Sequence, residues 1–270
     1  MGGFHQSTWP LQSPPWLLST MTYYRASADD IRSFLEHGYV LVRQLFLPPE
    51  VEQLNALARG DERIRERATS RSDAQGGTTT LALSNQLEDD VYSRIVASRR
   101  VAANMSLFLQ DEVYHYHHKM MLKEPRVGGA WEWHQDYGYW YNFGCLYPTM
   151  ASCYIAIDRA TRENGCLQVV PGSHHLGRID HGKVGGQTGA DAERVAAVLE
   201  RLPIVYAEME PGDGLFFHGN VLHRSDQNRS EYPRWGLICC YNTRKNNPYK
   251  ESRHPFYSPL ELIADEAVFG

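Results

Sequence analysis

Residues 113–122 read VYHYHHKMML, and this stretch marks the point where the sequence changes from helical to strand-like patterns. Four more short runs of β-strand character follow, separated by clusters of Gly, Pro and Asn. These runs are Ala151–Ile157, Cys166–Val170, Gly214–His218 and Trp235–Tyr241. Helical patterns first and short strands afterwards are typical of helices packed on an antiparallel β-sandwich or jelly roll. We therefore expect a mainly β fold with flanking helices, in which the N-terminal helices pack on one sheet.

Helix signals dominate the sequence before residue 113. Ser27 offers an N-cap, acidic residues suit the first turn after it, and Gly38 ends the helix. The charged stretch Arg59–Arg71 is expected to form a solvated helix face, and residues 75–78 should break the chain. The other expected elements are a strand at 39–42, a helix opened by Pro48-Pro49-Glu50, a helix at 89–109, and a helix at 190–202 inserted between strands.

The chain of 270 residues is long enough to bury a core in one large domain or two small ones. Residues 1–22 are expected to be a poorly ordered N-terminal segment. Residues 23–270 are expected to form a single domain, with its β core at about 113–245. We find no internal repeat and no low-complexity tract in the sequence.

Composition and charge exclude several classes of protein. The formal net charge of −5 argues against nucleic-acid binding, and no apolar run is long enough to span a membrane. The first twenty residues lack the basic and apolar blocks of a signal peptide. The five cysteines are odd in number and lack CxxC spacing, which favours a reducing compartment. We therefore expect a cytoplasmic protein, and the sequence leaves its oligomeric state open.

The segment Trp133-His134-Gln135-Asp136-Tyr137 carries the chemistry that the sequence suggests. In an extended strand, residues i and i+2 point to the same side, so His134 and Asp136 should converge while Gln135 faces away. His223, which follows the turn and strand at residues 211–218, can supply a third ligand. Two histidines and one carboxylate with open positions are the ligand set of non-haem Fe(II) oxygenases. Further aromatic residues near this segment would wall such a site: Trp131, Tyr139, Trp140 and Tyr141.

Several motifs in a fixed order strengthen this interpretation, because an HxD tripeptide alone often arises by chance. With them the chain resembles the phytanoyl-CoA dioxygenase family of Fe(II)/2-oxoglutarate oxygenases, from Ala28 to Tyr241. The motifs are Gly38-Tyr39-Val40-Leu41-Val42, Leu47-Pro48-Pro49-Glu50-Val51, His134-Gln135-Asp136, Glu163-Asn164-Gly165-Cys166-Leu167, Pro171-Gly172-Ser173-His174, Pro211-Gly212-Asp213, Phe217-His218, His223-Arg224-Ser225, Asn228 and Arg234.

The resemblance implies a double-stranded β-helix, or jelly-roll, core and a set of site residues. It makes His134, Asp136 and His223 the Fe(II) ligands and catalytic centre. Arg234, eleven residues after His223, matches the arginine that binds the distal carboxylate of 2-oxoglutarate, and a guanidinium suits that task. Ser225 matches the hydroxyl that supports the same carboxylate. Two further positions are implied beside the cosubstrate: Tyr154, where relatives often carry Trp, and Lys119, where some relatives have Met. A cation at Lys119 could instead hold the substrate.

The implied reaction uses 2-oxoglutarate and O2 as cosubstrates, releases succinate and CO2, and hydroxylates a substrate C–H bond. Desaturation, epoxidation and cyclisation remain open alternatives, whereas the presence of Asp136 argues against halogenation. The substrate is expected to be a small free metabolite or natural-product intermediate, because no compelling basic cluster for an acyl-CoA is visible. Five residues are candidates for contacts with the substrate: Trp133, Tyr137, Trp140, Lys123 and Arg126.

Alternatives of a plainer kind accompany these predictions. Arg234 could form a surface ion pair with Glu231, and His218 is expected to be a hydrogen-bonded structural histidine. The paired histidines at 117–118 and 174–175 are also expected to be mainly structural, although one of each pair could reach the pocket. Two other classes of protein stay open: a zinc hydrolase with a general base beside the metal, and a binding or sensor protein without turnover.

Overall fold

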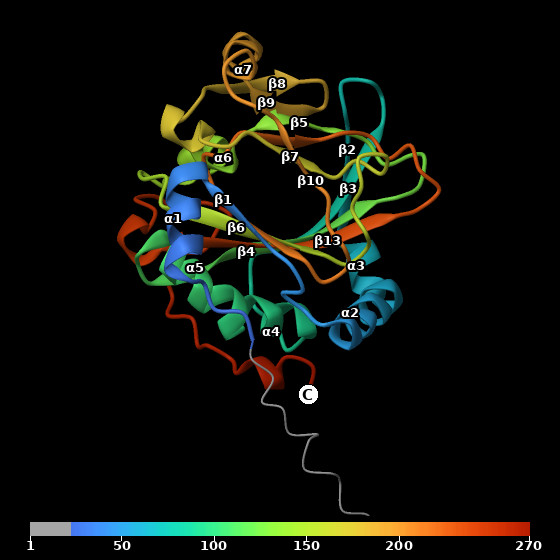
Figure 1. Cartoon of the computed structure of the whole chain (residues 1–270), viewed down its shortest axis with the longest axis vertical. Coiled ribbons are helices and arrows are strands. Elements are labelled where there is room, and N and C mark those ends of the chain that lie inside the picture. The colour runs from blue at the N-terminus through green and yellow to red at the C-terminus, as the bar shows by residue number, and fades with distance from the viewer. Residues whose placement is uncertain (1–22) are drawn as a thin grey trace, which may run out of the picture.

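The computed structural model describes residues 23–270, and its core is two antiparallel sheets facing each other (Figure 1). The predicted N-terminal segment 1–22 lies outside these residues. In spatial order, the seven-stranded sheet contains β1 (Tyr39–Val42), β11 (Gly214–His218), β6 (Met150–Ala156), β13 (Arg234–Thr243), β4 (Val113–Lys123), β3 (Thr78–Ser84) and β2 (Ala68–Ser72). The four-stranded sheet contains β10 (Val205–Ala207), β7 (Leu167–Val169), β12 (His223–Ser225) and β5 (Trp131–His134).

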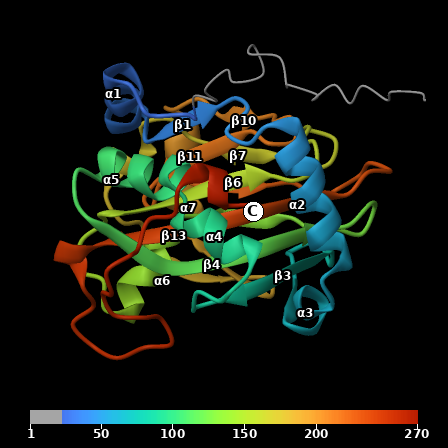
Figure 2. The ribbon, with the colours of Figure 1, turned by 90° about the horizontal axis from the view of Figure 1, so that it is seen from below.

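Helices cover the outer face of the large sheet, as Figure 1 and Figure 2 both show. A hairpin of β8 (His181–Val184) and β9 (Gln187–Ala190) lies beyond the small sheet together with the last helix. The described α-helices are α1 (Ala28–His37), α2 (Pro48–Gly60), α3 (Glu62–Glu66), α4 (Val91–Ala97), α5 (Asn104–Leu109), α6 (Asp136–Trp140) and α7 (Ala192–Leu199). None of them is long and apolar enough to cross a membrane.

The side chains of the large sheet alternate between two apolar cores. On β13, Leu237 and Cys239 face the helices and pack with residues such as Leu54 of α2. Ile238 and Cys240 face the small sheet and belong to the core between the two sheets. This period of two is the expected result of strand geometry. The outer core therefore stabilises the scaffold, and the inner one surrounds the space where a site can form.

The local signals at the start of the fold are confirmed. Ser27 accepts a hydrogen bond from the backbone of Asp30, whose carboxylate accepts one from Ser27, so the two form a capping box. Gly38 ends α1 with φ 80°, a left-handed conformation that glycine adopts at little cost. Pro48 opens α2 as expected. The predicted strands near 113, 151, 166, 214 and 235 are all present.

Two of the expected helical segments were wrong. The predicted helix 89–109 breaks at Ser98, whose φ of −65° and ψ of 146° are extended and separate α4 from the turns that lead into α5. The charged stretch 59–71 is not one helix face, because it contains the end of α2, all of α3 and most of β2. Strands β2 and β3 thus join the large sheet from outside the predicted core range of 113–245.

Candidate active site

The three predicted metal ligands meet where the ends of two neighbouring strands come together. His134 ends β5 and is paired directly with His223, the first residue of β12. Their ring centroids are 4.1 Å apart. With Asp136, they offer ligand atoms that all lie within 4.8 Å of one another. The structure therefore brings the three side chains together at one point.

The local geometry of this segment differs from the expected strand. Strand β5 stops at His134, and Asp136 is the first residue of α6, so the two side chains do not converge by strand alternation. Gln135 faces away as predicted, and it is fully buried. Its side chain donates to the carbonyls of Gly177 and Asn220 and accepts from the backbone of Ile179. These bonds fix the turn that presents Asp136.

Hydrogen bonds orient both imidazole rings. His134 Nδ1 donates to the Glu132 carbonyl at 2.6 Å, and His223 Nδ1 donates to the Val221 carbonyl at 2.9 Å. Each ring therefore keeps its Nε2 lone pair for a ligand, which is the usual arrangement of metal-binding histidines. Ser152 Oγ donates to Asp136 Oδ2 at 3.1 Å and holds the carboxylate in place.

The charges of the three groups suit a divalent cation. Burial lowers the pKa of His134 and of His223, so both imidazoles are neutral and able to coordinate. Burial alone would raise the pKa of Asp136, but the nearby Lys119 and the hydrogen bond from Ser152 help to hold it below its ordinary value. Lys119 Nζ lies 3.9 Å from Asp136 Oδ1. Two neutral imidazoles and one carboxylate fit the predicted Fe(II).

A cavity of about 790 Å³ opens between the two sheets beside these ligands. All three ligands line it, together with Lys119, Tyr154, Ser225, Arg234 and Trp140 of the predicted residues. Its other walls include Trp131, Tyr139, His117, Arg67, Arg71, Arg253 and His254. Asp136 is the only carboxylate that lines it within residues 23–270. The zinc hydrolase alternative therefore finds no second carboxylate here to serve as its general base.

Arg234 lines this cavity and is only 2% exposed. Its Nη1 donates to the Tyr154 hydroxyl at 3.0 Å, while its buried Nε has no partner within the described part of the chain. Gly236 makes room for this pair, because a Cβ there would lie 2.3 Å from the Tyr154 ring. A buried guanidinium with unused donors fits a carboxylate ligand such as the distal end of 2-oxoglutarate.

The plainer alternative for Arg234 was wrong. Glu231 pairs with Arg126 on the surface, so it is not the partner of the buried guanidinium. The structural interpretation of the other histidines agrees with their contacts. His218 accepts from the backbone of Asn220, and His174 and His175 donate to carbonyls of α1. Of the histidine pairs, only His117 reaches the cavity in the described structure.

Four of the five predicted substrate residues lie outside the cavity lining. Trp133 packs against a small apolar cluster that includes Val195 of α7, and the Tyr137 hydroxyl donates to the carbonyls of Cys145 and Leu146. Arg126 is exposed and paired with Glu231. Lys123 is buried against Ser225 and is 3% exposed, so it is no handle for a bound substrate. Among the five, only Trp140 lines the cavity.

Sequence patterns provide little signal for the remaining residues of the cavity. Arg71 lies on β2, in a stretch expected to be helical, and Arg253 follows the predicted core. Trp131 and Tyr139 belong to the aromatic run that was expected to wall the site, and both line the cavity. Only tertiary folding brings these segments together, so local spacing in the sequence does not predict their contacts.

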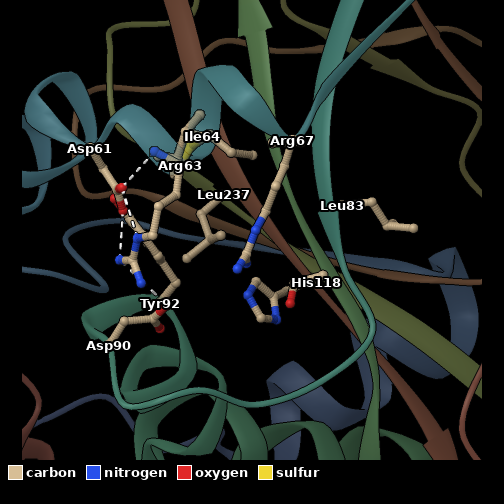
Figure 3. A pocket seen from close by; sticks show the side chains of 12 residues that line it. Asp61, Arg63, Ile64, Arg67, Leu83, Asp90, Tyr92, His118 and Leu237 are labelled. Carbon is tan, nitrogen blue, oxygen red and sulfur yellow. Dashed lines mark hydrogen bonds and ion pairs between the residues drawn. The ribbon is translucent and has the colours of Figure 1, made fainter.

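A second, much smaller cavity of about 40 Å³ lies on the other side of the large sheet, near α3 and α4 (Figure 3). His118 faces it, and the side chains of Asp61, Arg63 and Arg67 surround it. Asp61 and Arg63 satisfy each other through hydrogen bonds. The paired histidines of β4 therefore face opposite sides of the sheet, His117 towards the large cavity and His118 towards the small one.

Comparisons with known sequences agree with this site. A sequence model of the phytanoyl-CoA dioxygenase (PhyH) family matches residues 34–236. The L-proline trans-4-hydroxylase of Streptomyces griseoviridis is 32% identical over 184 residues, covering 62% of this chain and 69% of the relative. The ectoine dioxygenase of Bordetella bronchiseptica is 27% identical over 248 residues, covering 85% of this chain and 80% of the relative.

Solved structures share the fold and confirm the predicted jelly-roll core. EctD from S. alaskensis, solved with 2-oxoglutarate and 5-hydroxyectoine, has a TM-score of 0.72 at 22% identity, with 88% of each chain covered. The same protein solved with bound Fe has a TM-score of 0.72 at 23% identity and the same coverage. The chain therefore belongs to the phytanoyl-CoA dioxygenase family, and it is a non-haem Fe(II)/2-oxoglutarate-dependent dioxygenase.

Proposed function

We propose that this dioxygenase hydroxylates an unactivated C–H bond of a small acidic molecule. In this proposal His134, Asp136 and His223 hold Fe(II), and Arg234, Ser225 and Tyr154 hold the distal carboxylate of 2-oxoglutarate. The observation that carries the proposal is that the three ligands and the buried Arg234 line one cavity. Bound Fe(II) and 2-oxoglutarate supply the oxidising chemistry, which consumes O2 and releases succinate and CO2.

The chain's own residues bind and orient the cosubstrate and exclude water from the site. The guanidinium of Arg234 stays charged when buried and offers two parallel donors to a carboxylate. Tyr154 accepts from this guanidinium, which fixes its orientation. Lys119 lies beside Asp136 and keeps that carboxylate ionised. Aromatic side chains of the wall, among them Trp131, Tyr139 and Trp140, limit the access of water to the reacting centre.

The charge of the cavity indicates the class of substrate. Arg71 and Arg253 line it, and within residues 23–270 neither forms an ion pair with a carboxylate. Arg253 instead lies over the ring of Phe143, 4.9 Å from its centroid. In a protein with a net charge of −5, these free cations favour an acidic ligand. The cavity volume of about 790 Å³ suits a small molecule, and two relatives are named for L-proline and ectoine.

A panel of small acids tests this proposal through substrate-stimulated succinate formation. L-Proline, ectoine and related acids are compared with derivatives in which an amide or ester makes the carboxyl group neutral. We expect an acid to stimulate turnover and its neutral derivative to do so at least about tenfold less, because a charge-assisted hydrogen bond is lost. Arg253→Met and Arg71→Met should weaken the response, whereas Arg126→Met, outside the cavity, should not. Equal stimulation by the acids and their neutral derivatives would contradict an acidic substrate.

We also propose that the protein works in the cytoplasm and does not bind nucleic acid. All five cysteines are free and buried in the structure, which suits a reducing compartment. The net charge of −5 gives no support to polyanion binding. Cell fractionation with an antibody to the chain tests the location directly, and recovery from a secreted fraction would contradict it.

A further inference from the structure

Two buried cations lie side by side next to the large cavity, and one of them, Arg234, lines it. Lys123 ends β4 and is paired directly with Arg234, the first residue of β13. Side chains of directly opposed residues share one face of an antiparallel pair, and like charges in this position repel. Lys123 is 3% exposed and Arg234 is 2% exposed. Within the described residues no carboxylate forms an ion pair with either, so no neighbouring side chain neutralises the charge of this pair.

The contacts of Lys123 determine what Ser225 can do. Lys123 Nζ donates to Ser225 Oγ at 2.9 Å and also to the Asp226 carbonyl. In its charged form Lys123 has three donors and no acceptor, so Ser225 Oγ is then the acceptor. Its own hydroxyl proton is then left for another partner, and none is present among residues 23–270. Ser225 and Arg234 both line the cavity, where a bound carboxylate can accept that proton.

The loop that follows β6 is shaped around this lysine. Gly165 has φ +74°, and a Cβ there would lie 2.2 Å from the Asp226 carbonyl oxygen and 3.1 Å from Lys123 Nζ. Burial lowers the pKa of Lys123 well below its usual range, and Arg234 lowers it further. Charged lysine in this position is therefore costly without a nearby anion, which is the usual situation of a buried charge.

We propose that Lys123 is a positioning residue for the distal carboxylate of 2-oxoglutarate, acting through Ser225. It makes Ser225 a hydrogen-bond donor towards that carboxylate, and its charge adds to that of Arg234. The end of the site is then selective for 2-oxo acids that carry a second carboxylate. This inference rests on the proposed binding of 2-oxoglutarate at Arg234 and Ser225.

Equilibrium binding to the anaerobic Fe(II)-loaded protein tests the inference without turnover. Two ligands are titrated: 2-oxoglutarate, and 2-oxopentanoate, which has a methyl group in place of the distal carboxylate. We expect Lys123→Met to weaken the binding of 2-oxoglutarate about tenfold and to change the affinity for 2-oxopentanoate by no more than about twofold. Lys123→Gln, which can still donate to Ser225 without a charge, should fall between wild type and Lys123→Met. Arg126→Met removes a cation outside the cavity and is the matched control.

A double-mutant cycle with Ser225→Ala asks whether the lysine acts through the serine. In the Ser225→Ala background, Lys123→Met should weaken the binding of 2-oxoglutarate by clearly less than about tenfold. Equal losses for both ligands would assign Lys123 a merely structural role and overturn the inference, as would no loss for either. If Lys123→Met loses its fold or its iron, Lys123→Gln carries the same comparison. Failure of the wild-type protein to bind 2-oxoglutarate would instead overturn the proposed function.

Discussion

Arg234 is the residue whose surroundings bear most directly on the cosubstrate. Replacing it with Met removes a buried guanidinium that has unused donors and leaves the metal ligands untouched. We expect the KM for 2-oxoglutarate to rise about 10- to 100-fold, with a smaller change in kcat, because hydrogen bonds to charged groups contribute about 1.5–3 kcal/mol. Tyr154→Phe keeps the ring and loses only one partner of Arg234, so its effect should be smaller. An unchanged KM in Arg234→Met would remove its assigned role.

His115 and His118 should make the stability of the protein depend on pH. Burial lowers the pKa of His118 to about 4 and that of His115 to about 3, and the two rings share a hydrogen bond of 3.0 Å. Near His118, Asp90 and Glu88 oppose this shift and Arg67 adds to it. An unfolded imidazole has a pKa of about 6.5, so below that pH the unfolded state binds more protons. Stability is therefore complete above a pH of about 6.5 and falls as the pH drops towards about 4.

Urea unfolding between about pH 7.5 and pH 5 measures this effect. For each histidine held neutral by burial, the free energy of unfolding should fall by about 1.4 kcal/mol per pH unit in the affected range. His118→Asn should reduce the slope of the free energy of unfolding against pH by the contribution of one histidine. His37→Asn, at an exposed position, is the control. A profile equally steep in wild type and in His118→Asn would show that His118 is not the source.

At the residue scale, the sequence could predict the groups that are separated by short spacings. His134 and Asp136 lie two residues apart, whereas Ser225 and Arg234 were assigned through the family resemblance. The structure places all five at one cavity. The position of Lys123 could not be predicted, because its burial depends on the register of β4 against β13. Cavity residues such as Arg71 and Arg253 depend on segments that only tertiary folding brings together.

The elements that support the site depend on glycines at positions where a side chain would meet its neighbours. Gly165 and Gly76 both have positive φ, +74° and +83°, but of the two only Gly165 has atoms within 4 Å of the place that a Cβ would take. We expect Gly76→Ala to lower the free energy of unfolding by about 1 kcal/mol for its backbone conformation alone. Gly165→Ala should cost about 1–3 kcal/mol more, because the Asp226 carbonyl must move. Equal costs in thermal or urea unfolding would show that this close approach does not matter.

At the scale of elements, sequence signals predicted the boundaries correctly where a single residue determines the backbone conformation. They failed where tertiary contacts determine it. The N-cap at Ser27 and the left-handed Gly38 fixed α1 correctly. Nothing in the local pattern indicated the break at Ser98, whose hydroxyl donates to the Ile95 carbonyl. The start of α6 at Asp136 was also missed, because a strand that ends at His134 and turns into a helix at Asp136 also brings these two side chains to one point.

At the scale of the whole molecule, the two faces of the large sheet have different roles: one stabilises the fold and the other lines the site. One face of the large sheet packs against the helices, and the other face lines the cavity with the candidate site. Alternation along each strand therefore allows cavity residues to vary without loss of the outer core. The order of helical and strand-like patterns predicted helices on a β-sandwich or jelly roll, and the family resemblance favoured the jelly roll. The contribution of β2 and β3 to the sheet was not predicted, because β2 lies in a charged stretch that resembles a helix and the pairing of β3 with β4 depends on tertiary folding.

The most direct test of the central claim is the visible absorbance of the anaerobic protein titrated with Fe(II) and 2-oxoglutarate. We expect a charge-transfer band that saturates at one Fe(II) and one 2-oxoglutarate per chain. His134→Ala should abolish the band, and Arg234→Met should require more 2-oxoglutarate to reach it. A folded wild-type protein that gives no band and binds no 2-oxoglutarate in the presence of Fe(II) would contradict the account.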